Sequence, residues 1–367
     1  MQQANLQVTT LTAVARDRWN TFVSTWPHFA LMQTYEWGEF KEASGWRVTR
    51  VGIEQEGQLV AGAQLLIKPL PLHMASIAYI PRGPLLDWRD EAMASLLLDR
   101  LHEIARDQRA TMLKIEPPML RMSEAEKLLQ SYGFSSSEHT NQPLCTMIVD
   151  ITPDTDTILA NMHKTTRYNI RYSARKGVKI REGDEADLPT VYRLLEATAE
   201  RSGFPARAFD YYQQEWRALV QDGLVKLLLA SYDDEVIAFR MPAAFGGKAA
   251  TLHSGSLGAY FKLKPNDLLM WKSIEWAKEQ ECTSYDVWGI TEEVGKLVSQ
   301  GEPIPQDGKG GLWGVYYFKR GFGGEVVYYV GAYDFTYSPL LHRLMDTGLG
   351  YLGSVDRLAK MTDRWVR

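Results

Sequence analysis

Residues 46–68 read WRVTRVGIEQEGQLVAGAQLLIK, two runs rich in β-branched and aliphatic residues on either side of the polar segment Gln55 to Gln58. This pattern predicts two antiparallel strands joined by a tight turn. Residues 225–245, VKLLLASYDDEVIAFRMPAAF, have the same form, with the acidic residues of the DDE triplet at the expected turn. The sequence therefore predicts one β-hairpin in each half of the chain.

Each predicted hairpin is followed by the same succession of a strand, a helix and a second strand. In the first half these segments are residues 76–83, 91–108 and 111–117, and in the second half they are residues 249–255, 268–281 and 284–290. Strand pair, strand, helix, strand is the core order of the acetyltransferase-like fold. We therefore expect an α+β protein of two tandem acetyltransferase-like (GNAT-like) domains. Unrelated two-layer αβ domains share this alternation and remain an alternative.

The length also favours two domains, because 367 residues exceed the size at which a single core usually keeps growing. The segment ITPDTD at 151–156 is rich in turn and capping residues, so a helix should begin there with Asp154 or Thr155 as its cap. We expect a first domain over residues 1–152, completed by the C-terminal segment 331–367, and a second domain over residues 153–330.

The composition is that of an ordinary globular protein, with 45% hydrophobic and 23% charged residues. A formal net charge of −4 argues against a surface that coats nucleic acid, so DNA is not an expected partner. Cys145 and Cys282 have neither metal-type nor redox-type spacing and are expected to be buried free thiols. Because the N-terminus lacks a secretory signal and no apolar run approaches about 20 residues, we expect a cytoplasmic protein with at most peripheral membrane contact.

A basic segment stands out in this net acidic chain. Residues 163–181, HKTTRYNIRYSARKGVKIR, contain no acidic residue. Four of the cations follow one another at helical spacing, namely Lys164, Arg167, Arg171 and Arg175. They should share one face of a helix that Gly177 ends. Such a face suits the phosphates of tRNA or of a nucleotide-linked substrate, and it equally suits a solvated domain surface.

A glycine-rich stretch, residues 305–325, reads PQDGKGGLWGVYYFKRGFGGE and predicts a loop followed by a short aromatic helix. Its glycines could let the backbone approach an anionic ligand, whereas Lys319, Arg320 and Gly321 could equally form an ordinary helix end. No coenzyme A pyrophosphate loop, serine-nucleophile elbow or metal-type histidine pair is found. These absences disfavour coenzyme A, serine-hydrolase and metal chemistry.

Several of these segments together resemble the FemABX family of non-ribosomal peptidyltransferases. The resembling segments are QTYEWGEFKEASGW (33–46), YIPRGPLLD (79–87), KTTRYNIRYSARKGV (164–178), YDVWGI (285–290) and YYFKRGFGGE (316–325). Their collinear order over nearly the whole chain is more specific than any single motif. The family has a tandem acetyltransferase-like fold, and the resemblance implies a compact form without a coiled-coil helical arm.

The resemblance implies roles for particular residues. Lys41 matches a lysine that contacts the diphosphate of the muropeptide substrate, Arg207 matches its partner arginine, and Tyr211 would lie nearby. Lys319 matches a lysine beside the acyl ester of aminoacyl-tRNA, where a cation would stabilise the developing oxyanion. Glu116 falls where some members carry an aspartate proposed to assist proton removal, and a structural role for this carboxylate is the alternative.

The expected function is therefore transfer of an amino acid from aminoacyl-tRNA to the stem peptide of UDP-MurNAc-pentapeptide or lipid II. No metal or organic cofactor is expected, and the chain should be a monomer. His253 stands where the family tends to have tyrosine, which leaves a ligand contact there in doubt. A coenzyme A dependent N-acyltransferase of the same fold and a non-catalytic RNA-binding protein remain the alternatives.

Overall fold

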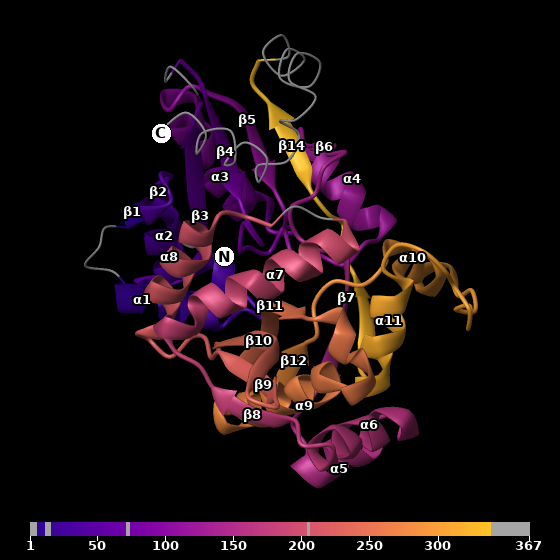
Figure 1. Cartoon of the computed structure of the whole chain (residues 1–367). Coiled ribbons are helices and arrows are strands. Elements are labelled where there is room, and N and C mark those ends of the chain that lie inside the picture. Colours follow the sequence, from indigo (N-terminus) through magenta and orange to yellow (C-terminus); the bar gives the residue numbers. More distant parts are fainter. Residues whose placement is uncertain (1–5, 12–15, 71–73, 204–205, 339–367) are drawn as a thin grey trace. The chain divides into compact units, whose positions relative to one another are not determined.

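The computed structural model describes residues 6–11, 16–70, 74–203 and 206–338 (Figure 1). These residues form two compact units, and the chain passes between them at Leu144/Cys145 and again at Tyr328/Tyr329. Each unit is built on one seven-stranded sheet.

The sheet of the first unit joins strands from both ends of the chain. Its order is β1 (Leu6–Leu11), β2 (Arg47–Gln55), β3 (Gln58–Pro69), β4 (Ser76–Ile80), β5 (Ala110–Ile115), β14 (Tyr333–Thr336) and β6 (Ser135–Ser136). The helices of this unit are α1 (Arg16–Ser24), α2 (Tyr35–Ala43), α3 (Glu91–Asp107) and α4 (Ser123–Ser131). Helix α3 packs on β2, β3 and β5.

The sheet of the second unit has the order β13 (Glu325–Tyr328), β7 (Cys145–Asp150), β12 (Ser284–Asp286), β11 (Lys248–Ser256), β10 (Glu235–Phe245), β9 (Leu228–Tyr232) and β8 (Lys179–Glu182). Its helices are α5 (Thr155–Asn161), α6 (Lys164–Arg175), α7 (Leu188–Ser202), α8 (Phe209–Val220), α9 (Pro265–Glu279), α10 (Glu292–Gln300) and α11 (Trp313–Lys319).

The two sheets repeat the same pattern of strand directions. In each of them a single parallel pair, β4–β5 or β11–β12, lies between antiparallel pairs on both sides. Both predicted hairpins are present, and their two-residue turns, Glu56–Gly57 and Asp233–Asp234, have positive φ angles. Such angles are those of the hairpin turns whose twist matches that of the strands. The predicted internal duplication is therefore present in the structure.

In each sheet, one strand beside the parallel pair is distant from it in sequence. This strand is β14 in the first unit and β7 in the second unit. Strand β7 pairs with β12 and β13 of the second unit, although the sequence placed residues up to 152 in the first domain. The boundary lies earlier because these backbone groups find their partners in the second sheet. Strand β14 pairs with β5 and β6 of the first unit, and residues 339–367 of the expected C-terminal segment lie outside the described residues.

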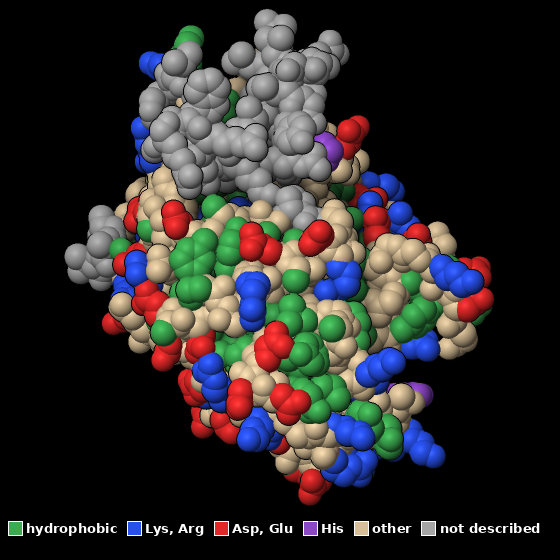
Figure 2. Space-filling view, viewed as in Figure 1, with side chains coloured by type: hydrophobic (Ala, Val, Ile, Leu, Met, Phe, Trp, Pro, Cys, Tyr) green, Lys and Arg blue, Asp and Glu red, His purple; other side chains and the backbone are tan. Residues whose placement is uncertain are grey.

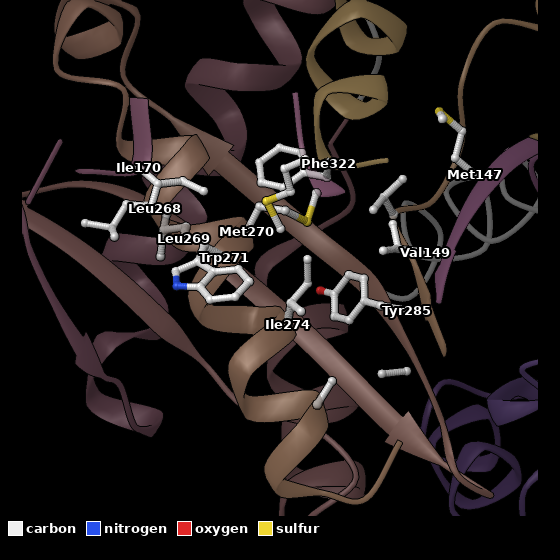
Figure 3. Close-up of a cluster of buried hydrophobic side chains, with 14 of the residues drawn as sticks. Met147, Val149, Ile170, Leu268, Leu269, Met270, Trp271, Ile274, Tyr285 and Phe322 are labelled. Atoms are coloured by element: carbon white, nitrogen blue, oxygen red, sulfur yellow. The ribbon is translucent and has the colours of Figure 1, made fainter. Parts of the chain in front are cut away.

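Each unit has its own hydrophobic core, and the larger helices bury their apolar faces against the sheets. In the second unit, Leu269, Met270 and Ile274 of α9 pack beside Tyr285 and Phe322 (Figure 3). Cys145 and Cys282 are buried free thiols, as the sequence predicted. Helix α5 begins at its predicted cap, where the side chain of Asp154 accepts a hydrogen bond from the backbone N–H of Thr157.

The parallel pair of the second unit separates after a short run of pairing. Strand β11 pairs with β12 only from Lys248 to Ala250 and then continues to Ser256 along β10. The chain beyond β12 follows β7 instead, because the N–H groups of Val287 and Ile290 donate to carbonyl oxygens of β7. We call this divergence, between residues 251–256 and residues 287–290, the fork. It leaves two short backbone stretches that no longer pair with each other.

The close approach of α7 to β11 requires a residue without a side chain at position 255. A Cβ atom on Gly255 would lie 2.8 Å from the carbonyl oxygen of Leu194 and 2.7 Å from Cε1 of Phe239. We expect Gly255→Ala to lower the free energy of unfolding by about 1–3 kcal/mol, as overpacking of a close-packed core does. Urea unfolding followed by circular dichroism measures this change.

Gly314, near the start of α11, provides the matched control because a Cβ atom there meets nothing within 4 Å. Gly314→Ala should leave the stability unchanged or raise it by up to about 1 kcal/mol, since alanine favours a helix over glycine. Equal effects of the two substitutions would contradict the close approach of α7 to β11.

Candidate functional site

Lys319 brings a primary amine to one branch of the fork. It is the last residue of α11, and its half-buried side chain donates a hydrogen bond from Nζ to the carbonyl oxygen of Gly289, at 2.8 Å. This carbonyl belongs to the branch that follows β7. Among the described residues no second acceptor is recorded for Nζ, so two of its N–H groups remain available to a ligand.

Neighbouring groups shift the pKa of Lys319 in opposite directions. Burial and, less strongly, the charge of Arg240 lower the pKa of Lys319, the carboxylate of Asp286 opposes both, and together they bring this pKa to about 7. Asp286 is held in place by the backbone N–H of Trp288, at 2.7 Å, and by the hydroxyl of Thr146. The amine can therefore exist in both protonation states near neutral pH.

Arg240 belongs to a buried polar row that crosses the sheet. Its Nη1 donates to the hydroxyl of Thr251 at 3.0 Å, and that hydroxyl lies 2.9 Å from the hydroxyl of Tyr285. Only 3% of Arg240 is exposed, and burial lowers the pKa of its guanidinium. On the α9 side, Asp267 accepts a hydrogen bond from Asn169 at 3.0 Å, and burial raises the pKa of Asp267.

The sequence did not predict a role for Arg240, Thr251 or Asp286. A signal was nevertheless present, because an arginine in the apolar run VIAFRMPAAF and an aspartate at the end of a buried strand are both rare without a partner. Composition and spacing gave no means of telling which partner each of them would have.

One glycine of the loop before α11, Gly308, has a packing role. A Cβ atom on Gly308 would lie 2.4 Å from the ring of Trp313, so the backbone of the loop lies against the indole. After the helix, Gly321 accepts a hydrogen bond from the backbone N–H of His163 at 2.9 Å, and a Cβ atom on it would lie 2.2 Å from the hydroxyl oxygen of Thr166. The end of α11, with Lys319, therefore adjoins the start of the basic helix α6.

Helix α6 has the predicted bounds and ends before Gly177, whose φ is 90°. Three of the four predicted cations are exposed, namely Lys164, Arg171 and Arg175. Arg167 instead donates to the carbonyl oxygens of Ala160, at 2.6 Å, and Met162 at the end of α5. Figure 2 shows lysine and arginine side chains gathered at the lower right, over α5 and α6. The helix therefore presents a cationic surface in which Arg167 has a structural contact.

Arg207 and Tyr211 lie together at the start of α8. The guanidinium carbon of Arg207 is 4.2 Å from the centroid of the Tyr211 ring, a distance typical of a cation–π contact. The backbone N–H of Arg207 also donates to the hydroxyl of Tyr212 at 3.4 Å. The structure thus brings together two of the residues that the sequence assigned to the acceptor substrate.

Lys41 lies in the first unit, on α2, where its Nζ is 4.4 Å from the centroid of Phe40 and 4.9 Å from that of Trp37. The side chain is 9% exposed, so its amine sits in an aromatic setting. Helix α2 is fixed by the hydroxyl of Thr34, which accepts from the backbone N–H of Trp37 at 3.2 Å. The cap of α2 and the two aromatic rings thus fix the position of the Lys41 amine.

Glu116 lies just beyond β5 and is 3% exposed. Its Oε1 accepts from the backbone N–H groups of Asn141, at 2.6 Å, and Gln142, at 3.1 Å, and its Oε2 accepts from the hydroxyl of Tyr79. Burial raises the pKa of Glu116, whereas these hydrogen bonds and the charge of Arg82 oppose the rise. With three donors on one carboxylate, the geometry favours the structural role that the sequence left open.

Within the described ranges no helix is both long and apolar enough to cross a bilayer. In the same part of the chain, no three His, Cys, Asp or Glu side chains come together as a metal site would require.

Two duplicated GNAT-like sheets, the second carrying a half-buried lysine in its fork, define a tandem GNAT-like protein. The model of the FemAB family matches residues 14–234 and 224–347, and the chain belongs to this family.

Individual relatives support this assignment. Lipid II:glycine glycyltransferase of Staphylococcus aureus is 30% identical over 223 residues, which cover 58% of this chain and 53% of that protein. The chain thus spans about half the length of the curated relatives that it matches. The crystal structure of FemX superposes with a TM-score of 0.79 at 22% identity, covering 93% of this chain and 100% of that chain. A tandem GNAT protein from the clavulanic acid biosynthesis pathway has a TM-score of 0.55 at 14% identity, covering 91% of this chain and 99% of that chain. These two structures share the fold.

The low pKa of Lys319 gives the stability a defined pH dependence. The ordinary lysine value is 10.5, so between about pH 7 and pH 10.5 the unfolded chain binds a proton that the folded chain does not. Stability from this group therefore rises with pH across that window and is lost as pH falls through it. Relative to Lys319→Met, the wild type should become more stable as pH is raised from 7 to 10, as measured by urea unfolding.

Lys296, an exposed residue paired with Glu292 at 3.1 Å, provides the control. Lys296→Met should differ from the wild type by a nearly constant amount over the same pH range. A flat difference for Lys319→Met as well would show that the amine is solvated like an ordinary lysine.

Proposed function

We propose that this chain transfers an amino acid from aminoacyl-tRNA to the stem peptide of a peptidoglycan precursor. The observation that carries the proposal is the position of Lys319. Its amine donates to the carbonyl oxygen of Gly289 on one branch of the fork, and its other N–H groups are available to a ligand. Two residues later, the carbonyl oxygen of Gly321 accepts from the backbone N–H of His163, which links the end of α11 to the start of the basic helix α6. A cation suited to an acyl oxygen thus adjoins a surface suited to RNA phosphates.

The relatives supply the chemical class of the acceptor. The Staphylococcus aureus relative is named as a glycyltransferase acting on lipid II, whose stem peptide carries a free amine. We infer the same class of acceptor here, either lipid-linked or as UDP-MurNAc-pentapeptide. The reaction is assigned to the cytoplasm, where aminoacyl-tRNA is available.

In the proposed mechanism the stem-peptide amine attacks the carbonyl carbon of the aminoacyl ester. Negative charge then develops on the former carbonyl oxygen, and the protonated amine of Lys319 donates to it. The hydrogen bond to Gly289 fixes Nζ before the substrate arrives, so little reorganisation is needed in the transition state. Asp286 favours the charged form of Lys319, which is the form that the step requires.

We assign Arg207 of the second unit to the acceptor diphosphate, and we make the same assignment for Lys41 of the first unit on the family resemblance alone. Arg207 already stacks on Tyr211, which limits the conformations of its guanidinium and leaves less entropy to lose on binding. Tyr211 is therefore assigned to positioning Arg207 and to contacting the substrate beside it. Glu116 is assigned to holding residues 141–142 in place, and a catalytic contribution from it remains a prediction.

Transfer itself is tested by incubating the protein with a mixture of charged tRNAs and either acceptor form, and then reading the product mass. The wild type should add one amino-acid increment to at least one acceptor. Lys319→Met should lower kcat by about 10²–10³-fold, as loss of one oxyanion donor does.

Lys296→Met, which removes an exposed lysine of the same unit, should leave the rate unchanged. RNA binding should be retained in Lys319→Met, because the donor phosphates contact other residues. No mass increment with any donor and acceptor would refute the proposal, and transfer from acetyl coenzyme A in a parallel incubation would support the coenzyme A alternative.

The basic helix offers a matched pair of arginines for testing RNA binding. Arg171 is exposed, whereas Arg167 is engaged with the carbonyl oxygens at the end of α5. Arg171→Ala should weaken tRNA binding and reduce the slope of log K against log salt by about 1, the contribution of one phosphate contact. Filter binding at several salt concentrations measures both quantities.

Arg167→Ala should instead lower the stability of the second unit and leave the salt slope nearly unchanged. If Arg171→Ala binds tRNA as the wild type does at every salt concentration, α6 is only a solvated surface.

A further inference from the structure

His253 forms an ion-pair-like contact that the sequence did not predict. It lies on the branch of the fork formed by β11, three residues beyond the last residue that pairs with β12. Its Nε2 is 2.6 Å from Oε2 of Glu215 on α8. The side chain of Glu215 is 2% exposed, and that of His253 is 24% exposed. A buried carboxylate thus holds a histidine whose ring reaches the surface.

The contact determines which ring nitrogen can take up a proton. Because a carboxylate only accepts hydrogen bonds, the neutral His253 ring carries its hydrogen on Nε2 and its lone pair on Nδ1. Within the described part of the chain, Nδ1 has no hydrogen-bond partner. The arrangement of carboxylate, imidazole and free nitrogen is that of an oriented base.

The ring of His253 is linked through Tyr212 to Arg207, one of the residues assigned to the acceptor. The ring of Tyr212 meets it edge-on, with centroids 5.2 Å apart, and the hydroxyl of Tyr212 accepts from the backbone N–H of Arg207. On the opposite branch of the fork, Gly289 holds the amine of Lys319. His253 therefore lies on one branch and the oxyanion donor on the other.

We propose that His253 is the group that removes a proton from the attacking amine, with Glu215 as its positioning residue. The proposal rests on the aminoacyl transfer proposed above. An aliphatic amine has a pKa of about 10 and is mostly protonated at neutral pH, so it must lose a proton before it can attack.

The proton balance of the step is complete without a further reactant. Nδ1 of His253 takes one proton from the substrate ammonium, and the resulting imidazolium donates to Glu215 through Nε2. The amine nitrogen then forms a bond to the ester carbonyl carbon, and the bond from that carbon to the ribose oxygen breaks. The second proton of the nitrogen moves to the departing ribose oxygen, and His253 releases the first proton to solvent.

The test compares His253→Ala with the wild type under conditions in which both substrates saturate the enzyme. kcat should fall by about 10²–10⁴-fold, the usual contribution of a positioned base, while KM for the acceptor changes little. Imidazole added to the buffer should restore part of the kcat of His253→Ala. Glu215→Gln keeps a hydrogen-bonding group at the same place and should lower kcat less than His253→Ala does.

A second acceptor separates proton removal from a structural role. An acceptor whose amine is replaced by an aminooxy group is largely unprotonated at neutral pH, so its transfer should lose much less rate in His253→Ala. Equal losses for both acceptors with no imidazole rescue would overturn the proposal, as would an unchanged kcat. A raised KM with unchanged kcat would make His253 a binding residue and overturn it as well.

Failure of the proposed function has a different signature. In that case the wild type transfers no amino acid to either acceptor, whereas failure of the present inference leaves wild-type transfer intact. Circular dichroism and tRNA binding of His253→Ala should match the wild type, since the side chain of His253 is 24% exposed and lies at the edge of the core. His253→Phe, which keeps a ring against Tyr212, provides a second variant if the alanine variant is unstable.

Discussion

The separation of β11 from β12 is the constraint on which the candidate site depends. A buried backbone must satisfy its hydrogen-bonding groups, and after Ala250 the two strands do so with different neighbours. The branch that follows β7 leaves the carbonyl of Gly289 facing Lys319, whose ammonium or amine is a suitable donor. Backbone pairing thus sets the position of the carbonyl oxygen that accepts the hydrogen bond of the Lys319 amine.

The corresponding parallel pair of the first unit, β4 with β5, instead stays paired to the last residue of both strands. There the N–H of Glu116 bonds the carbonyl of Ile80 at 3.2 Å, and the Glu116 carboxylate ties down Asn141 and Gln142. A carboxylate with three donors closes this region and has little capacity left for a ligand. The same fold therefore supports two arrangements. In the first unit the Glu116 carboxylate is hydrogen-bonded within the protein, and in the second unit Lys319 has N–H groups available to a ligand.

The hairpins, the long helices and most core positions were predictable from the sequence, because they depend on local periodicity and turn chemistry. Strand β14 falls in the C-terminal segment that the sequence placed with the first domain, whereas the membership of β7 was not predictable, since its partners lie far away in sequence and no local pattern specifies them. Lys319 was found through the family resemblance, whereas Arg240 and Asp286 became meaningful only when folding placed their charges around it. For Arg167 the sequence pattern misled, because its helical spacing predicted an exposed cation. In the structure its guanidinium donates to a backbone carbonyl oxygen at the end of α5.

Asp286 and Glu215, both in the second unit, act on neighbouring basic side chains in different ways. Asp286 raises the pKa of Lys319 by its charge, while Nζ, within the described residues, donates to a backbone carbonyl only, which leaves its other N–H groups for the proposed oxyanion contact. Glu215 instead bonds its histidine directly, which fixes the ring and leaves the opposite nitrogen as the acceptor. The proposed transfer uses a charged donor, Lys319, and a neutral acceptor, His253. The fork keeps their surroundings distinct, because one branch carries Gly289, which accepts from Lys319, and the other carries His253, which is bonded to Glu215.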